Sequence, residues 1–353
     1  MCVCVRVRAC VRVLYTLFNS NLALIPQGSV LLLEKGDIIP VTRHPDFRIF
    51  ACMNPATDVG KKDLPSGIRN RFTELFVDEL VAELDLMTLS AEYLKGVNLP
   101  QSVHKGLVKF YLDVRAKAEN SLSDISGKRP HYSLRTFCRA LRLASTNRYG
   151  HPLRSLFESF CLSFLTRLNR SSHPIVIDMV TASLKGATRN LNSILKQPLP
   201  EPKRVDSSSL SISSSSSSHV LVKDYWLRKG GADCVVDEFY VVTDSVSANL
   251  KDLSRVVSAF SFPVLIQGET SVGKTSLIQY LADSTGNHCV RINNHEHTDI
   301  QEYVGSYGAD AATGALVYQD GVLVEAMRKG KWEVSFVWVI IESDGPNLSY
   351  FLR

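Results

Sequence analysis

The most constraining feature of this chain is the run Gly268-Glu269-Thr270-Ser271-Val272-Gly273-Lys274-Thr275, which fits the pattern G-x-x-x-x-G-K-[ST]. Glycines in such a loop let backbone N–H groups close around an anionic phosphate chain. An apolar run at 262–266 precedes the loop, and we expect it to form a strand. A helix from Lys274 to about Ala282 is expected to follow, with the positive end of its dipole facing the same anion.

This order of strand, loop and helix predicts a site for a nucleoside triphosphate, with ATP and Mg²⁺ as ligands. Lys274 is expected to reach the β- and γ-phosphates, and the hydroxyl of Thr275 to ligate Mg²⁺. Glu269 occupies a variable position, so only its backbone belongs to the site. The alternative is a chance match in an ordinary loop, which the flanking elements argue against. The predicted binding residues are Gly268, Glu269, Thr270, Ser271, Val272, Gly273, Lys274, Thr275 and Ser276.

Composition narrows the class of protein. A net charge of +5 is modest for 353 residues, so charge alone supports neither nucleic-acid nor membrane binding. Eight cysteines are scattered without zinc-ligand spacing or a dense disulfide framework, which indicates a reducing compartment. No apolar stretch approaches the ~20 residues that span a bilayer, so we expect no membrane association.

Hydrophobic periodicity predicts short strands in two parts of the chain. We expect strands at 45–53 and 72–77, with a short helix at 65–70 between them. Beyond the phosphate loop we expect a strand at 288–293 and an amphipathic helix at 321–329.

From residue 79 to residue 196 the apolar spacing becomes helical, which indicates an all-helical subdomain. Its apolar stripes indicate core packing rather than chemistry; they are Leu86, Leu89 and Tyr93 in one helix and Leu134, Phe137 and Leu141 in another. Prolines then end regular structure, and the nearly pure serine run at 207–218 is too polar to form a core. That run is predicted to be a flexible linker or insertion.

Five runs carry a resemblance to a known family. They are RHPDFR at 43–48, FACMNPATDVG at 50–60, IRNRFTEL at 68–75, VLIQGETSVGKTS at 264–276 and VRINNHEHTDIQEY at 290–303. On these runs the chain resembles the midasin family of giant, dynein-related AAA-type ATPases. The resemblance covers residues 39–330, the serine run excepted.

The resemblance implies an α/β fold class made of AAA-type P-loop NTPase modules, each a parallel sheet flanked by helices, with an all-helical lid subdomain. The chain resembles the end of one module joined to the start of the next, so both modules are expected to be incomplete. The expected parts are a divergent segment at 1–38, the end of an AAA large subdomain at 39–80, the lid at 81–197, a Pro/Ser-rich linker at 198–222, the first half of a second large subdomain at 223–330 and a divergent tail at 331–353.

In the first module the resemblance implies two sensor residues. Asn54 would be sensor 1, which orients the attacking water near the γ-phosphate; the alternative is an Asn that caps the turn before Pro55. Arg135 would be sensor 2 of the lid, and the alternative is an ordinary surface arginine on a helix.

The resemblance also implies an arginine finger at Arg69 or Arg71. A guanidinium inserted into a neighbouring module's nucleotide site stabilises the charge of the transferring phosphoryl group. The choice between the two arginines stays open, because one of them can instead pair with Glu74 or Asp78.

Two features of the second module argue against a metal site at its histidines and against a complete catalytic site. His295, Glu296 and His297 lack the i, i+4 spacing that places two histidines on one metal, and they belong to the family pattern, so we expect a structural role. After Gly330 the family continues into a strand that ends in an Asp-Glu pair, whereas no such pair occurs here. The alternative acids are Glu342 and Asp344, which sit late in the sequence.

By resemblance, the chain is an ATP-binding part of a midasin-like AAA ATPase. That enzyme acts as a chaperone that remodels pre-60S ribosomal particles for large-subunit assembly and export from the nucleus, in nucleolus and nucleoplasm. The implied partners are these particles with their assembly factors, and other AAA modules of the same ring. We expect ATP to bind and to be hydrolysed poorly, because each nucleotide site is half built.

Two other classes of function stay open. One is a non-catalytic interaction module that docks on other AAA modules, and the other is an AAA ATPase of the dynein or MoxR type. Basic segments at 128–129 and 135–142 leave direct contact with RNA as a further alternative. The first thirteen residues, rich in Arg and free of acids, are compatible with a mitochondrial transit peptide or an edge strand, although translation of a non-coding repeat explains their alternation best.

Overall fold

The fold is taken from a computed structural model, which describes residues 29–30, 41–42, 46, 48, 50–53, 69–70, 72–146, 149–188, 190–202, 218–259, 262–292, 299–309 and 316–335. The chain divides into two compact units, one up to Glu79 and one from Leu80 onward.

The first unit contains little regular structure among its described residues. The strand β1 (Ser29–Val30) pairs antiparallel with β2 (Val41–Thr42). The strands predicted at 45–53 and 72–77 are wrong where the structure describes them, since no residue of either run lies in a strand. A strand is stable only when its backbone joins a hydrogen-bonded ladder, and no described segment supplies one here. The large apolar side chains of Phe50, Leu75 and Phe76 are correspondingly exposed.

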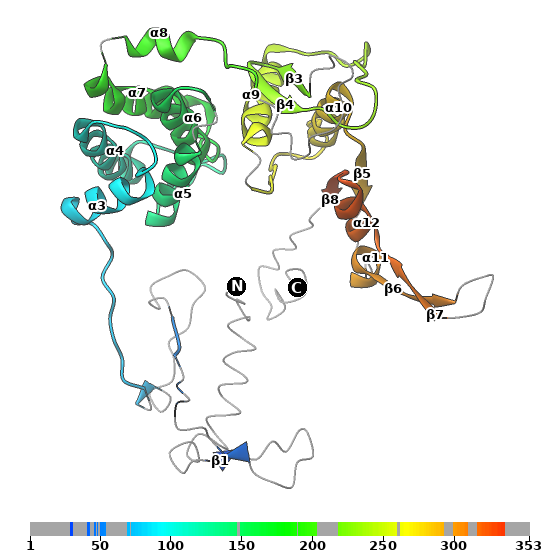
Figure 1. Ribbon diagram of the computed structural model, residues 1–353, viewed down its shortest axis with the longest axis horizontal. Helices are drawn as coiled ribbons and strands as arrows, with labels where there is room; N and C mark the ends of the chain where they lie inside the picture. The colour runs from blue at the N-terminus through cyan, green and yellow to red at the C-terminus, as the bar shows by residue number, and fades with distance from the viewer. Residues whose placement is uncertain are drawn as a thin grey trace, which may run out of the picture. The chain divides into compact units, whose positions relative to one another are not determined.

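The second unit begins with a helical subdomain, which we call the lid (Figure 1). Its helices are α3 (Glu83–Tyr93), α4 (Gln101–Asn120), α5 (Leu134–Ser145), α6 (Pro152–Phe164), α7 (His173–Leu184) and α8 (Leu191–Lys196), with short 3₁₀ turns at Arg170–Ser172 and Lys185–Ala187. The predicted all-helical subdomain is therefore confirmed. Pro152 opens α6 at a position where its missing N–H costs nothing.

Aromatic side chains from three helices form the centre of the lid. Phe110 of α4 makes edge contacts with Phe160 and Phe164 of α6, at ring-centroid distances of 5.5 and 5.1 Å. Tyr111 stacks on Phe137 of α5 at 4.8 Å. Such pairs add about 0.5–1.5 kcal/mol each beyond the burial of their area. The predicted stripe residues Leu86, Phe137 and Leu141 are buried in this core, whereas Tyr93 is exposed.

The second half of the unit, which we call the core subdomain, starts with a β-hairpin. The strands β3 (His219–Val222) and β4 (Tyr225–Arg228) pair antiparallel through a two-residue turn at Lys223 and Asp224. Both turn residues have positive φ, 46° and 74°, which matches the right-handed twist of the flanking strands. The helices α9 (Asp244–Ser258) and α10 (Lys274–Thr285) follow.

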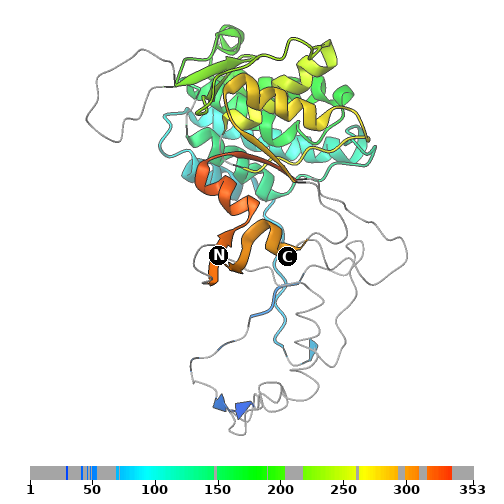
Figure 2. The same ribbon diagram turned by 90° about the vertical axis from the view of Figure 1, so that its right-hand side faces the viewer.

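The remaining elements of the core subdomain form a parallel pair and a projecting hairpin. The strand β5 (Cys289–Ile292) pairs parallel with β8 (Trp332–Ser335), and the connection between them contains α11 (Ile300–Val304), β6 (Gly305–Ala309), β7 (Leu316–Asp320) and α12 (Val322–Lys329). The hairpin of β6 and β7 extends away from the lid helices (Figures 1 and 2). The strand predicted at 288–293 and the helix predicted at 321–329 are confirmed.

One predicted strand of this subdomain is absent. Residues 262–266 lead into the phosphate loop without joining a sheet, because no described strand lies in register with them. Apolar composition supplied the prediction, but a parallel strand also needs a neighbour on the ladder. Among the described residues, no helix is long and apolar enough to cross a membrane.

Removing an aromatic ring from the lid centre should destabilise the chain strongly. Phe160 is fully buried, so Phe160→Ala deletes a large side chain from a packed core and should cost about 3–5 kcal/mol of unfolding free energy. Leu84→Ala on α3 is the control, because Leu84 is 81% exposed and should change stability by less than about 0.5 kcal/mol. Chemical denaturation followed by circular dichroism measures both; equal effects would contradict the described core.

Acidification should destabilise the lid through His104. Burial lowers the pKa of this imidazole below its ordinary value, and its Nδ1 lies 2.9 Å from the hydroxyl of the buried Ser90. The unfolded chain therefore takes up the proton more readily, so stability is full above the unfolded pKa of about 6.5 and falls as the pH drops through it.

The pH effect is measured as the free energy of unfolding between pH 7.5 and 5 in the wild type and in His104→Gln. The variant should lose part of the slope, and His173, whose pKa burial also lowers, should account for a further part. Identical slopes in the two proteins would show that His104 does not contribute.

Candidate nucleotide-binding site

The phosphate loop contains two residues in the left-handed backbone conformation. Ser271 and Gly273 have positive φ, 65° and 81°, so the chain turns sharply just before α10 begins. Glycine suits such a conformation because it has no Cβ, whereas Ser271 carries a strained backbone of the kind found at ligand-binding turns. Gly273 caps α10, and its carbonyl accepts the backbone N–H of Leu277 at 2.9 Å.

The side chain of Lys274 makes two hydrogen bonds to the backbone of this loop. Its ammonium donates to the carbonyl oxygens of Gly268 and Glu269, at 3.0 and 2.6 Å. The side chain therefore folds back over the loop from the first turn of α10, where the backbone N–H groups of the helix have no intrahelical partner. A positive ammonium, free helix N–H groups and the helix dipole together make the mouth of the loop attractive to an anion.

The rest of the predicted binding residues lie in the same short segment. Gly268 to Val272 are exposed, Thr275 is half-buried in the first turn of α10, and Ser276 is exposed. A hydroxyl next to a lysine at the start of a helix is a ligand type that Mg²⁺ accepts, together with phosphate oxygens and water. Among the described residues, no cluster of three or more His, Cys, Asp or Glu side chains forms a separate metal site.

A segment before α9 packs along the phosphate-loop helix. The ring of Tyr240 stacks on Tyr280 of α10 at 4.5 Å, and the backbone N–H of Val235 donates to the backbone carbonyl of Asp283 at 2.9 Å. Thr243 then caps α9 by accepting the N–H of Val246 at 3.4 Å. These contacts fix the path of the chain beside α10.

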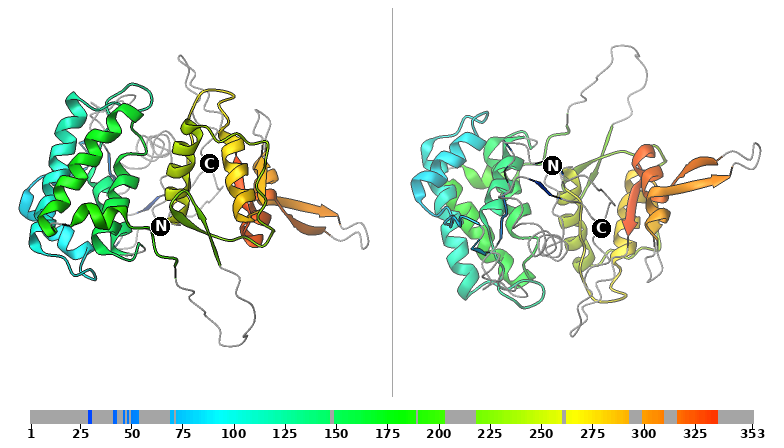
Figure 3. Two further views of the ribbon diagram at one scale, coloured as in Figure 1. Left: turned by 90° about the horizontal axis from the view of Figure 1, so that it is seen from above. Right: turned by 90° about the horizontal axis from the view of Figure 1, so that it is seen from below.

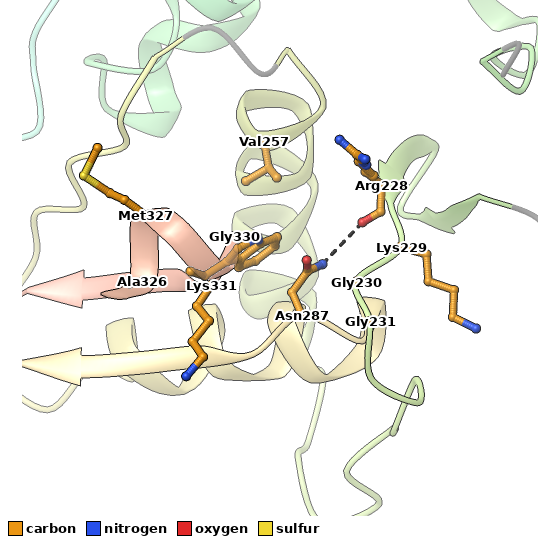
Figure 4. A pocket seen from close by; sticks show the side chains of 11 residues that line it. Arg228, Lys229, Gly230, Gly231, Val257, Asn287, Ala326, Met327, Gly330 and Lys331 are labelled. Carbon is orange, nitrogen blue, oxygen red and sulfur yellow. Dashed lines mark hydrogen bonds between the residues drawn. The ribbon is translucent and has the colours of Figure 1, made fainter. Parts of the chain in front are cut away.

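A pocket of about 650 Å³ lies at the other end of α10 (Figure 4). Its lining includes residues at the end of β4 and near the starts of β5 and β8. The side-chain amide of Asn287 donates to the carbonyl of Arg228 across the pocket at 3.3 Å. The pocket is separate from the phosphate loop, because Asn287 lies two residues beyond the end of α10, whereas Lys274 is the first residue of that helix. Figure 4 shows the side chains of Lys229 and Lys331 pointing in different directions, so they do not converge on one anion.

Some of the candidate residues of the first module lie among the described residues, and others lie outside them. Asn54 and Arg71, and likewise the triplet His295, Glu296 and His297, lie outside the described residues. Arg69 donates to both carboxylate oxygens of Glu74 at 2.7 Å, and this hydrogen-bonded guanidinium lowers the pKa of Glu74. Arg69 thus adopts the alternative that the sequence left open, an ion pair within its own unit. Arg135 lies exposed in the first turn of α5.

A buried ion cluster joins the lid to the core subdomain. Its members, which we call the Glu158 cluster, are Glu158 and Arg154 of α6, Tyr225 of β4 and Arg255 of α9. One carboxylate oxygen of Glu158 lies 2.9 Å from Arg154 Nε. The other accepts from Tyr225 Oη at 2.8 Å and from Arg255 Nε at 2.9 Å. Glu158 and Tyr225 are each 1% exposed.

Sequence reasoning missed this cluster, although one signal was present. Glu158 is the only acid of α6, whose other residues are mainly Leu, Phe, Ser and Cys. A lone carboxylate on an apolar helix has to meet a cation or a donor if it is buried. Nothing in the sequence pattern tells which of the many downstream arginines meets it.

Comparison with known proteins matches two parts of the chain to family models and most of the chain to midasins. Residues 85–187 match the family described as Midasin AAA lid domain, and residues 263–335 match AAA domain (dynein-related subfamily). Midasin from Dictyostelium discoideum is 43% identical over 309 residues, which are 87% of this chain and 5% of that protein. Midasin from Giardia intestinalis is 35% identical over 312 residues, which are 83% of this chain and 6% of that protein.

The matched regions agree with the described structure. The first covers the lid from α3 to the 3₁₀ turn at Lys185–Ala187, and the second runs from the approach to the phosphate loop through β8. The chain spans only 5% and 6% of the length of these relatives. It nevertheless belongs to the midasin family of AAA proteins, with a helical lid joined to an α/β segment of a dynein-related AAA domain.

Proposed function

We propose that the core subdomain binds ATP with Mg²⁺ at the loop from Gly268 to Ser276. The observation that carries the proposal is the loop conformation: Lys274 sits over a turn of positive-φ residues that ends at the start of α10. In this site Lys274 would leave the carbonyls of Gly268 and Glu269 to contact the β- and γ-phosphates. The Thr275 hydroxyl would hold Mg²⁺, whose role when bound is to neutralise phosphate charge.

We propose further that this chain hydrolyses ATP poorly. Phosphoryl transfer depends on an acid that positions water or metal and on sensors that contact the γ-phosphate. The sequence after Gly330 contains no Asp-Glu pair, and the sensor and finger candidates, Asn54, Arg69, Arg71 and Arg135, belong to the preceding module. Binding and turnover are therefore separable in this chain.

We propose the cellular role that the family resemblance implies. This role is the remodelling of pre-60S ribosomal particles during large-subunit assembly, in nucleolus and nucleoplasm. The partners would be these particles, their assembly factors and other AAA modules of the same ring. Because the chain spans 5–6% of the relatives' length, it would supply one nucleotide-binding segment and one lid to that activity.

A second candidate is a non-catalytic interaction module. The observation in its favour is the Glu158 cluster, which shows a lid of this family docked on an AAA core through buried charges. A chain of this kind would act by binding another AAA module through its lid or its core subdomain. The two candidates differ in whether Lys274 matters for function.

Nucleotide binding should depend on Lys274. Lys274→Ala removes a charge-assisted contact to phosphate worth about 1.5–3 kcal/mol, so the dissociation constant for a fluorescent ATP analogue should rise about 10- to 150-fold in the presence of Mg²⁺. Lys329→Ala is the control, because Lys329 is exposed on α12 and pairs with Glu325. Equal binding by the wild type and Lys274→Ala would refute the proposed site and favour the interaction module.

Turnover should be far below that of intact enzymes of this class. Under saturating Mg-ATP, phosphate release by the 353-residue chain should stay well under the ~1 s⁻¹ at which typical enzymes begin. A rate of 1 s⁻¹ or more that disappears in Lys274→Ala would show that the chain holds a complete catalytic site.

A further inference from the structure

The pocket at the far end of α10 is lined by cations and by no acid. Its charged lining residues are Arg228, Lys229 and Lys331. The other lining residues are neutral, and they include three glycines, whose backbone is accessible because they carry no side chain. A volume of about 650 Å³ lies within the range of pockets that hold ligands. A charged group that enters this pocket would therefore be an anion.

Two of these cations have no acidic partner among the described residues. Arg228 ends β4 and Lys229 follows it, and both side chains are exposed. Lys331, by contrast, is paired, because its ammonium lies 3.3 Å from a carboxylate oxygen of Glu325. Hydrogen bonds from Lys329 and Lys331 lower the pKa of Glu325, so this carboxylate stays charged. The pocket thus has two available cations and a third that is paired with an acid outside its lining.

The directions of the three cations exclude a single compact anion. Neighbouring residues of an extended segment point to opposite sides, and Figure 4 shows the side chains of Arg228 and Lys229 diverging. Lys331 points in a third direction. One phosphate group cannot contact all three cations at once, whereas an extended chain with several carboxylates can meet each cation with a different acid. The arrangement therefore favours a ligand whose negative charges are separated.

Apolar side chains lie between the cations. Val257 of α9, Met327 of α12 and Trp332 of β8 line the pocket, and α9 packs beside α10 in both views of Figure 3. Trp332 packs against the buried cluster of α9 and α10, whereas Met327 is 74% exposed. An apolar side chain of a peptide would cover Met327 and remove its surface from water. A nucleic-acid strand would instead need an exposed aromatic ring for its bases, and the Trp332 ring packs into the core.

The backbone of the pocket supplies a further hydrogen-bond donor. The N–H groups of Gly230 and Ala232 donate to backbone carbonyls at the end of α10, at 2.9 and 3.0 Å. The N–H of Gly231, between them, has no partner among the described residues. A Cβ placed on Gly231 would meet no atom within 4 Å, so this residue borders open space. A main-chain carbonyl of an extended peptide can accept this N–H, as in other modes of peptide recognition.

We propose that this pocket binds an acidic, extended peptide segment of a partner protein. Carboxylates of the peptide meet Arg228 and Lys229, and an apolar side chain covers Met327. Lys331 is a third contact that becomes available when it leaves Glu325. This site goes beyond the proposed nucleotide binding and does not rest on it, because the phosphate loop lies at the opposite end of α10.

The test is fluorescence anisotropy of a short fluorescein-labelled peptide that alternates aspartate with leucine, titrated with the 353-residue chain. The peptide should bind, and its affinity should fall as salt is added, because exposed charges are screened. The same peptide with asparagine in place of aspartate should bind about tenfold more weakly, since its ion pairs are lost. Equal binding of the two peptides would overturn the proposal.

Three variants locate the binding site. Lys229→Glu should raise the Kd of the acidic peptide about fivefold or more, because an attraction becomes a repulsion. The matched control is Lys105→Glu, the same change at an exposed lysine of α4 outside the pocket, and it should alter the Kd by less than about twofold. Glu325→Gln should lower the Kd, because it frees Lys331. Equal effects at Lys229 and Lys105, or weaker binding in Glu325→Gln, would overturn the proposal.

Two competitors separate this pocket from other anion sites. Excess Mg-ATP should leave the acidic peptide bound. Displacement by Mg-ATP that disappears in Lys274→Ala would place the peptide at the phosphate loop and overturn the proposal. Tighter binding of a single-stranded oligouridylate than of the peptide, lost in Lys229→Glu, would make the pocket a nucleic-acid site and would also overturn it. Because the peptide titration contains no nucleotide, its failure is distinct from failure of ATP binding.

Discussion

The carboxylate of Glu158 is the group on which the arrangement of lid and core subdomain depends. A charge that is 1% exposed is tolerated only when cations and donors surround it, and here two of its three partners come from the neighbouring subdomain. The aromatic centre of the lid stabilises the helices, and the apolar contacts of the core stabilise α9 and α10. The two subdomains meet instead through the Glu158 cluster and through a small apolar cluster of Leu143, Leu162 and Ala259.

Local sequence patterns predicted the helices well, because a helix forms its backbone hydrogen bonds within its own segment. The stripes in α3 and α5, the helix after the phosphate loop and α12 followed from periodicity and start signals, because such signals lie within the element itself. The strand β5 was also predicted, and it forms because β8 supplies a neighbouring strand. The runs at 45–53, 72–77 and 262–266 have strand-like composition but form no strand among the described residues. A strand depends on a partner distant in sequence, which composition does not reveal.

The residues of the candidate site also differ in how far the sequence could predict their contacts. The turn from Gly268 to Thr275 lies in one short segment that carries every group that the motif requires, and Lys274 reaches back over it to the carbonyls of Gly268 and Glu269. Its contacts to phosphate stay a prediction. Arg69 shows the opposite case, since its bond to Glu74 is one of several pairings that its sequence allowed. The Glu158 cluster unites residues from positions 154 to 255, and only three-dimensional packing reveals which arginine completes it.

The most direct test of the account is a double-mutant cycle between Glu158 and Arg255, measured as free energies of unfolding of the whole chain. Glu158→Gln leaves Arg255 with Asp252, 3.5 Å away, and Arg255→Met leaves Glu158 with Arg154, 2.9 Å away. Each single variant therefore removes one charge of the pair that Glu158 forms with Arg255, whereas the double variant removes both. If the two charges stabilise each other, the double variant should cost less than the sum of the single variants by about 1 kcal/mol or more. Additivity within about 0.5 kcal/mol would contradict the claim that this pair holds lid and core together.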